Sequence, residues 1–265
     1  MKVVLILAGL DPSGGAGLIA DVLGVRARGL HPVAVATALT VQDSARCHAA
    51  EPVDASLVER QIEALVEDLE IAAVKIGMVG NATVARMIAR GIAGLAARGV
   101  PIVLDPVLRA SVGADLLEGD AGEALAPLLA IATLATPNRE EAEALTGFAI
   151  GDGTGSAGGD AGDGKRAARA LRALGPKAVL LKGGHFAGET VTDLLDDGGE
   201  PLVLAAKRQP GGSPHGTGCA LSTDIACLLA LEKPLRDAVG EAHARLQERI
   251  TGAQQLGKGR RFLGA

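Results

Sequence analysis

The chain is organised around His215-Gly216-Thr217-Gly218-Cys219, a glycine-flanked turn that runs directly into residues 220–231. Apolar side chains recur at helical spacing in that segment and would face a core as one stripe: Leu221, Ile225, Leu228 and Leu229. The first N–H groups of a helix lack internal partners and carry the positive end of its dipole, and glycine lets an anion approach them. The stretch therefore predicts a helix whose amino end binds a phosphate or a developing oxyanion.

Cys219 lies in the same electrostatic field. The amino end of a helix lowers the pKa of a thiol, so we expect Cys219 to be a thiolate or a proton acceptor near neutral pH. The alternative is a helix start in which glycine allows tight packing and a small cysteine is buried.

Length and composition favour one domain over residues 1–265, with a buried core and no membrane span. Hydrophobic residues make up 48% of the 265, yet no uninterrupted apolar run approaches the roughly 20 residues that a membrane span needs. The short apolar run at residues 3–8 ends in Gly9-Leu10-Asp11-Pro12 and predicts a buried strand, not an export signal. Three cysteines without metal spacing suit a reducing compartment, so we expect a cytoplasmic protein.

The charge distribution argues against nucleic acid as a partner. The net charge is -5, and the only aromatic residues are three phenylalanines. A nucleic-acid binder would show a basic stripe or stacking aromatic side chains. A small-molecule ligand fits better, and the basic residues 258–261 are expected to be a solvated terminus.

Strand and helix patterns alternate along the chain. Continuous apolar runs predict buried parallel strands at residues 3–8, 31–39, 72–78, 101–104, 131–135 and 178–181. Helical patterns separate them, including residues 57–69, 81–98, 119–129 and 165–174, and short strands at 191–195 and 202–205 precede a last helix at 234–250. Residues 151–164 have a composition that predicts a mobile surface excursion. The pattern indicates an α/β fold with a central, mostly parallel sheet between helices.

A glycine loop follows the first predicted strand, over residues 9–17. It lacks the ending of a P-loop and the spacing of a dinucleotide fingerprint, which argues against a nicotinamide-dependent oxidoreductase. With Asp11 and Asp21 nearby, the loop could form the floor of a pocket for a small polar ligand. The alternative is a tight turn with an aspartate helix cap.

Residues at the ends of two further predicted strands are candidates for ligand contacts, because the carboxyl ends of parallel strands line a crevice. Gln42 offers the donor and acceptor that the edge of an aminopyrimidine needs, although a surface glutamine would look the same. Met78 could pack against a flat ring or simply fill the core. Lys75 could be no more than a strand-edge solubilising residue.

Four residues are candidates for phosphate and Mg²⁺ contacts. Asp105 follows a buried strand and could orient a hydrated Mg²⁺, although Asp-Pro also starts ordinary turns. Asn138 and Glu141 share one face of a helix start, where they could hold metal-bound water or form a capping box. Lys182 follows an apolar strand and precedes two glycines, which would place its ammonium group among phosphates.

Seven fragments together resemble the bacterial hydroxymethylpyrimidine/phosphomethylpyrimidine kinases of thiamine biosynthesis. They span nearly the whole chain in order: Ala8-Gly9 with residues 11–17, Ala38-Leu39-Thr40-Val41-Gln42, Lys75-Ile76-Gly77-Met78, Leu104-Asp105-Pro106-Val107, Thr136-Pro137-Asn138, Lys182-Gly183-Gly184-His185 and His215-Gly216-Thr217-Gly218-Cys219. The resemblance implies a ribokinase-like fold. It also implies a kinase that transfers the terminal phosphoryl group of ATP to 4-amino-5-hydroxymethyl-2-methylpyrimidine and then to the monophosphate.

The resemblance also assigns roles to residues. The pyrimidine would be bordered by Gly9, Ala16, Asp21, Thr40, Gln42, Met78 and Val107. The phosphates and Mg²⁺ would face Asp105, Asn138, Glu141, Lys182 and His215, with Asp105 and Glu141 on the metal. Residues 216–219, namely Gly216, Thr217, Gly218 and Cys219, would form the anion hole, and Cys219 would take the hydroxyl proton.

Some positions depart from the family pattern, and other functions stay open. Ile19 stands where glutamine is common, Asp43 where asparagine is common, and Arg109-Ala110-Ser111 where a lysine-serine-glycine stretch is usual. Arg109 is a candidate substitute for the basic residue over the phosphates. The alternatives are a pyridoxal/pyridoxine kinase of the same superfamily and a noncatalytic pyrimidine-binding regulator. The family is usually dimeric, so a homodimer is expected.

Overall fold

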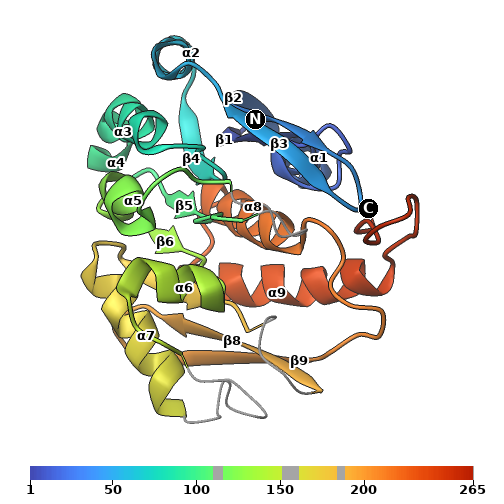
Figure 1. Cartoon of the computed structure of the whole chain (residues 1–265). Coiled ribbons are helices and arrows are strands. Elements are labelled where there is room, and N and C mark those ends of the chain that lie inside the picture. Colours follow the sequence, from blue (N-terminus) through green and yellow to red (C-terminus); the bar gives the residue numbers. More distant parts are fainter. Residues whose placement is uncertain (110–115, 151–160, 184–188, 265) are drawn as a thin grey trace.

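One sheet runs through the part of the chain that the computed structural model describes, residues 1–109, 116–150, 161–183 and 189–264 (Figure 1). Its nine strands lie in the order β3-β2-β1-β4-β5-β6-β7-β8-β9. They are β1 (Val3–Leu10), β2 (His31–Gln42), β3 (Cys47–Pro52), β4 (Ile71–Ile76), β5 (Ile102–Leu104), β6 (Leu134–Ala135), β7 (Ala178–Leu181), β8 (Thr190–Asp196) and β9 (Leu202–Lys207). Strands β2, β1, β4, β5, β6 and β7 pair in parallel, and β3, β8 and β9 are antiparallel additions at the two edges. The expected mostly parallel sheet is confirmed.

Strand β1 shows why its apolar run is continuous. Successive side chains of a strand point to opposite faces of the sheet. Leu5 and Leu7 pack into the core on one face, whereas Val4, Ile6 and Ala8 pack into a separate core on the other. Both faces of the strand are therefore buried, and polar residues have no place in it.

Helices cover both faces of the sheet. The core on one face takes side chains from α2 (Ala55–Asp68), α3 (Ala82–Gly91), α4 (Ala93–Ala97), α5 (Ala121–Leu129), α6 (Arg139–Thr146) and α7 (Ala161–Ala173). The cores on the opposite face take side chains from α1 (Gly17–Ala27), α8 (Thr217–Ala230) and α9 (Leu235–Thr251). Among the described residues, none of these helices combines the length and the apolar character that a membrane crossing requires.

Several predicted boundaries are wrong. The helix expected at 81–98 is two helices, α3 and α4, and the chain leaves the first where Gly91 packs tightly against Ile62 of α2. Helix α7 begins at Ala161, before the predicted start at residue 165. The rest of the predicted surface excursion, residues 151–160, lies outside the described residues. Strand β2 continues to Gln42, because pairing with the unpredicted β3 extends it.

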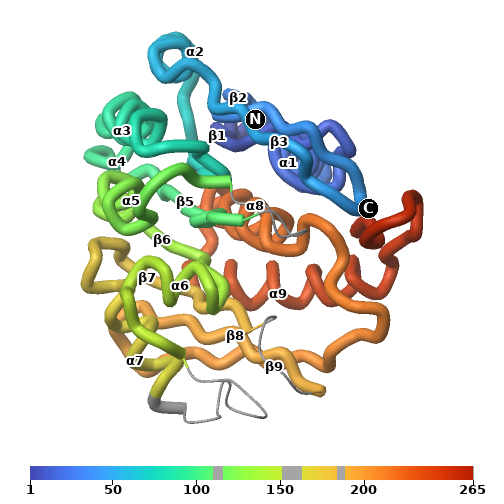
Figure 2. Tube along the Cα trace, viewed as in Figure 1, coloured from blue at the N-terminus to red at the C-terminus, as the bar shows by residue number. Residues whose placement is uncertain are grey.

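The C-terminal segment, residues 253–264, keeps Lys258 and Arg260 exposed, as expected, but its backbone is hydrogen-bonded to other parts of the fold. It lies beside the end of the β2–β3 hairpin, as the red and blue parts of the tube show (Figure 2). The N–H of Arg260 donates to the Ser44 carbonyl at 2.8 Å, and the Arg261 carbonyl accepts from the N–H of His215 at 2.8 Å. The segment thus joins the hairpin to the turn that precedes α8.

Candidate active site

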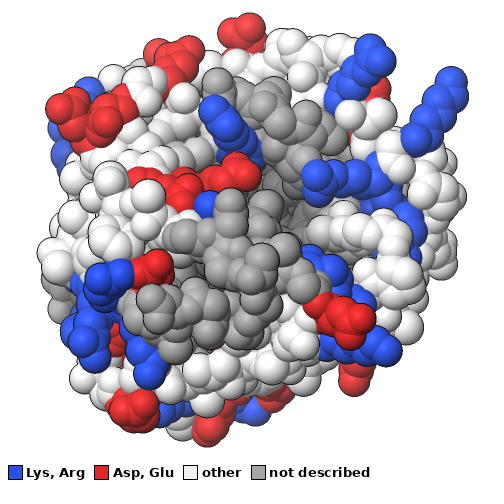
Figure 3. Space-filling view, turned by 60° about the horizontal axis from the view of Figure 1, so that its bottom comes forward, with Lys and Arg blue, Asp and Glu red and all other residues white. Residues whose placement is uncertain are grey.

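A cavity of about 1680 Å³ opens at the carboxyl ends of the parallel strands. Residues from the ends of β1, β2, β4 and β5 and from the start of α8 line it. In the space-filling view, the hollow has acidic side chains on one side and basic side chains on the other (Figure 3). This is the edge of an open α/β sheet where ligands bind.

The cavity brings together all but one of the residues that sequence and resemblance nominated. Its lining includes Gly9, Ala16, Thr40, Gln42, Met78, Asp105, Val107, Asn138, Glu141, Lys182, His215, Gly216, Thr217, Gly218 and Cys219. Asp21 is the exception, because its carboxylate is buried behind the cavity and bonded to other side chains. Asp21 therefore does not line the cavity in which the resemblance places the pyrimidine.

The amino end of α8 has the geometry of an anion site. Gly216 has a φ of 81°, and a Cβ there would lie 2.0 Å from the Gly15 carbonyl oxygen, so only glycine fits. At Gly218 a Cβ would lie 3.2 Å from Lys182 Nζ. The free N–H groups of the first helical turn and a lysine ammonium group therefore converge on one space.

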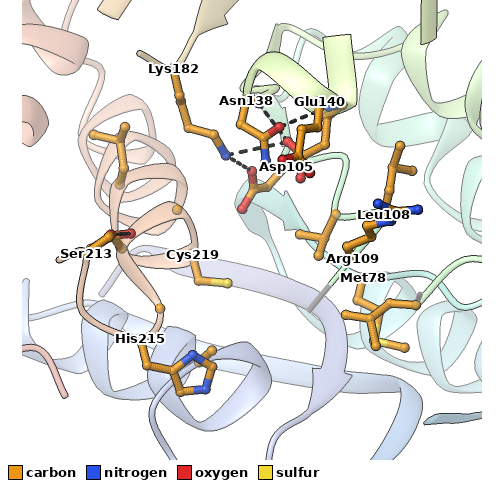
Figure 4. A pocket seen from close by; sticks show the side chains of 18 of the residues that line it. Met78, Asp105, Leu108, Arg109, Asn138, Glu140, Lys182, Ser213, His215 and Cys219 are labelled. Carbon is orange, nitrogen blue, oxygen red and sulfur yellow. Dashed lines mark hydrogen bonds and ion pairs between the residues drawn. The ribbon is translucent and has the colours of Figure 1, made fainter. Parts of the chain in front are cut away.

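Lys182 bridges two carboxylates at this end of the cavity. Its Nζ lies 2.6 Å from Asp105 Oδ1 and 3.9 Å from Glu141 Oε2. Figure 4 shows the ammonium group pointing at Asp105, with the side chain of Cys219 directed into the same space. Burial alone would lower the pKa of Lys182, but Asp105 and Glu141 outweigh it and raise that pKa. Lys182 is therefore a fixed positive charge.

Glu141 has two roles in the structure. Its carboxylate accepts a hydrogen bond from the N–H of Asn138 at 2.7 Å, and Asn138 Oδ1 accepts from the N–H of Glu141 at 2.9 Å. This is the capping box that the sequence left open, at the start of α6. Burial raises the pKa of Glu141 to about 7, with Lys182 opposing and Asp105 adding to the shift. A bound cation would favour the ionised form.

The sulfur of Cys219 lines the same cavity as Lys182 and Gln42. The expected lowering of its pKa is wrong: burial, which disfavours the thiolate, raises the pKa to about 11. Lys75 and the N–H of Gly17 act in the opposite direction, whereas Asp21 and Asp105 add to the increase. The resting side chain is consequently a thiol.

Lys75 is not a solubilising residue at a strand edge. Its side chain is 0% exposed, and its Nζ lies 2.5 Å from Asp21 Oδ2. Thr223 of α8 donates to the other oxygen of Asp21 at 2.8 Å. Burial lowers the pKa of Lys75, but Asp21, Cys219 and Asp105 together outweigh it and raise that pKa. The pair places a positive charge beneath the cavity, close enough to act on Cys219 and Asp105.

The other end of the cavity carries the residues expected around a flat ring. Gln42 Nε2 lies 3.0 Å from His215 Nε2, and Thr40 Oγ1 donates to the Leu10 carbonyl at 2.9 Å. Met78 packs so closely on Gly9 that a Cβ there would lie 2.6 Å from its sulfur. His215, expected beside the phosphates, thus contacts Gln42 at the ring end. This part of the cavity combines polar groups with an apolar thioether surface.

Sequence reasoning missed several lining residues. The loop before α8 contributes residues 208–213, and Leu246, Gln247 and Ile250 of α9 and Arg260 complete the wall. Their contribution depends on tertiary packing, and only Gly211-Gly212 in the loop offered a local signal. Arg109 lines the cavity, as expected for a residue near the phosphates, whereas Ala110, Ser111 and His185 lie outside the described residues.

Comparisons with known proteins agree with this geometry. The family model described as phosphomethylpyrimidine kinase matches residues 11–263. The hydroxymethylpyrimidine/phosphomethylpyrimidine kinase of Rhizobium meliloti is 41% identical over 97% of this chain and 94% of that protein. The crystal structure of phosphomethylpyrimidine kinase from Clostridium difficile is 34% identical, with a TM-score of 0.77, over 94% of this chain and 100% of that one. An ADP complex of Bacillus subtilis pyridoxal kinase is 25% identical, with a TM-score of 0.86, over 99% and 96%.

The layered sheet and the glycine turn beside Lys182 define a small-molecule kinase with a ribokinase-like fold. The family model covers residues 11–263, and the Rhizobium meliloti kinase is 41% identical to this chain. These two findings identify the family. The chain belongs to the phosphomethylpyrimidine kinase family.

Proposed function

We propose that the protein is an ATP-dependent kinase that phosphorylates 4-amino-5-hydroxymethyl-2-methylpyrimidine and then its monophosphate in thiamine biosynthesis. The observation that carries the proposal is that Gln42, Lys182 and Cys219 line one cavity at the amino end of α8. A ring at the Gln42 end would present its hydroxymethyl group toward the anion site. The names of the relatives and the family model support the same activity.

Phosphoryl transfer needs positioning and charge neutralisation more than covalent chemistry. Lys182 and the N–H groups of the first turn of α8 would neutralise charge on the transferred group. Cys219 would accept the hydroxyl proton, which requires its thiolate form. Burial raises its pKa to about 11 even though Lys75 lowers it, so the role requires positive charge beyond that of Lys75 when the substrates are bound.

Asp105 and Glu141 fit a Mg²⁺ ion that also contacts nucleotide phosphates. Among the described residues no group of three or more His, Cys, Asp or Glu side chains gathers as a metal cluster. Mg²⁺ in such sites takes one or two carboxylates and completes its shell with water and phosphate oxygens. The bound ion would supply charge neutralisation for the phosphates. Glu141→Gln should reduce the extra thermal stabilisation that Mg²⁺ adds to ATP, which a thermal shift assay measures without turnover.

The decisive experiment is incubation with ATP, Mg²⁺ and hydroxymethylpyrimidine, with mass detection of products. We expect the monophosphate to appear first and the diphosphate to follow. Cys219→Ala is the matched control for a contaminating kinase, because its preparation differs only at the proposed base. The absence of any ATP-dependent phosphorylated product from the wild-type protein would reject the proposal.

The second candidate is a pyridoxal kinase, and the similarity to the Bacillus subtilis pyridoxal kinase favours it. Pyridoxal also presents a hydroxymethyl group on a flat nitrogen ring. Measurements of kcat/KM with hydroxymethylpyrimidine and with pyridoxal distinguish the two functions. A higher kcat/KM for pyridoxal would make pyridoxal kinase the better assignment. A noncatalytic regulator would bind the pyrimidine without consuming ATP in either assay.

Three further expectations remain proposals. We propose that residues 1–265 form a single kinase domain, that it assembles as a homodimer and that it acts in the cytoplasm. Its three cysteines are free in the structure, which suits a reducing compartment. Light scattering of the purified protein measures the assembly directly.

A further inference from the structure

His215 is fixed between two polar groups at the ring end of the cavity. Its Nε2 lies 2.7 Å from Asp11 Oδ2 and 3.0 Å from Gln42 Nε2. Phe262 of the C-terminal segment packs edge-on against the imidazole, with 6.2 Å between ring centroids. A Cβ at Gly15 would lie 2.4 Å from the imidazole Cδ2, so the glycine loop leaves room for this arrangement. The ring has little freedom to turn.

The contact with Asp11 determines where the imidazole proton resides. Asp11 accepts hydrogen bonds from the N–H groups of Ser13 and Ala16. Burial raises the pKa of Asp11, but hydrogen bonds from His215 and Ser13 outweigh it and lower that pKa. A carboxylate only accepts, so Nε2 of His215 must be the donor. The other ring nitrogen, Nδ1, is buried and has no hydrogen-bond partner among the described residues, so a proton there would be unsatisfied.

This proton fixes the orientation of the Gln42 amide. A protonated Nε2 cannot accept a hydrogen bond from Gln42, so the amide oxygen is the atom suited to face it, sharing with Asp11 the one proton that Nε2 carries. Rotation of the amide by half a turn exchanges its two terminal atoms and makes Oε1 the atom at the imidazole. Gln42 has no other hydrogen bond to a described residue. The NH₂ group is then free to face the cavity that Gln42 lines.

We propose that His215, oriented by Asp11, is a positioning residue that makes Gln42 a hydrogen-bond donor to a ring nitrogen of the substrate. The inference rests on the proposed function for the identity of the ring. Gln42 would then discriminate between rings by an acceptor nitrogen and not by the exocyclic amino group. A donor without its acceptor costs free energy in a desolvated site, so the ring nitrogen becomes a specificity determinant.

The first test observes the imidazole directly and needs no substrate. Nitrogen NMR of the ¹⁵N-histidine-labelled wild-type protein, with His215→Gln to assign the signals, reports which ring nitrogen carries the proton. We expect a protonated Nε2. An unprotonated Nε2 beside a protonated Nδ1 would overturn the proposal, whether or not the protein phosphorylates pyrimidines.

The second test measures specificity with three substrate analogues, two that replace one ring nitrogen by C–H and one that lacks the amino group. We expect one ring-nitrogen analogue to lose about 10- to 100-fold in kcat/KM with the wild-type protein. With Gln42→Leu that loss should disappear, while the loss from removing the amino group should stay the same. The donor assignment would be overturned if Gln42→Leu changed the loss caused by removing the amino group. It would also be overturned if Gln42→Leu changed the loss for neither ring-nitrogen analogue.

His215→Leu tests the positioning role. It should reduce the discrimination between the parent ring and the ring-nitrogen analogue while leaving the KM for ATP unchanged. His215→Gln, which can still donate to Asp11 and Gln42, should restore part of the discrimination. An unchanged ratio in a folded His215→Leu variant would reject the positioning role. If the leucine variant does not fold, Gln42→Glu decides, because a carboxylate removes the donor and should lower kcat/KM for the parent ring only.

Discussion

Lys75 Nζ lies 2.5 Å from Asp21 Oδ2, and neither side chain has exposed surface. The lysine comes from β4 and the aspartate from α1, so the pair joins the sheet to a helix on one face. A buried ion pair often contributes little net stability, but removal of one partner leaves an uncompensated charge in the interior. The pair is therefore sensitive to single substitutions.

Lys75→Met should lower the free energy of unfolding by about 3–5 kcal/mol, because Asp21 loses its only cationic partner among the residues that the structure describes. The double variant Lys75→Met/Asp21→Asn should recover a substantial part of that loss, since no charge is then stranded. Urea unfolding measures the free energy of unfolding of both variants and of Asp21→Asn, which together form a double-mutant cycle. Additive effects of the two substitutions would contradict the coupling.

Cys219→Ala should lower kcat by about 100- to 10,000-fold, the range for loss of a general base, with little change in ATP affinity. Cys227→Ala is the matched control on the same helix, because Cys227 is also a cysteine but is fully buried in the core. Steady-state kinetics and nucleotide binding measure both effects. Near-native turnover of Cys219→Ala would remove the base assignment.

The Cys219 thiol should titrate far above neutral pH in the unliganded protein. Burial raises its pKa to about 11, above the ordinary value of 9.0, so the protonated form dominates up to about pH 10 and the thiolate appears only beyond it. The difference in thiolate absorbance between wild-type protein and Cys219→Ser measures this directly. A thiolate signal that is complete by pH 8 would show that the fold activates the sulfur before any substrate binds.

Lys182→Ala should raise the KM for ATP by about 10- to 100-fold, because a charge-assisted contact to phosphate is lost. It also leaves Asp105 without the ammonium group at 2.6 Å, so a lower Tm is expected as well. Lys177→Ala is the control, since Lys177 is exposed on the same segment of chain. An unchanged KM and turnover would count against a phosphate role for Lys182.

Elements that depend on local sequence could be predicted, whereas elements and contacts that depend on distant partners could not. The strand at 178–181 was predicted with its boundaries, because four consecutive apolar residues are buried on both faces. Strand β3 escaped detection because Cys47–Pro52 has no apolar alternation and is stabilised by pairing with β2. Lys75 and Asp21 were misjudged for a related reason, since nothing near either residue reveals a partner 54 positions away.

The thiol of Cys219 shows the limit of reasoning from one local effect. The helix amino end predicts a lowered pKa, and the first turn of α8 is where the sequence placed it. The fold adds burial and two carboxylates, which together outweigh Lys75 and the N–H of Gly17. The sign of the shift therefore depends on tertiary structure, whereas the position of the sulfur in the site was predictable.

The contact between the C-terminal segment and Ser44 also bears on synthesis of the protein. The hairpin that carries Gln42 emerges early from the ribosome, but the imidazole beside it is secured by Arg261 and Phe262, which emerge far later. A nascent chain can form the first strands and their local helices well before that moment. The ring-binding end of the cavity is consequently completed only after Phe262 has emerged, long after the strands that surround it.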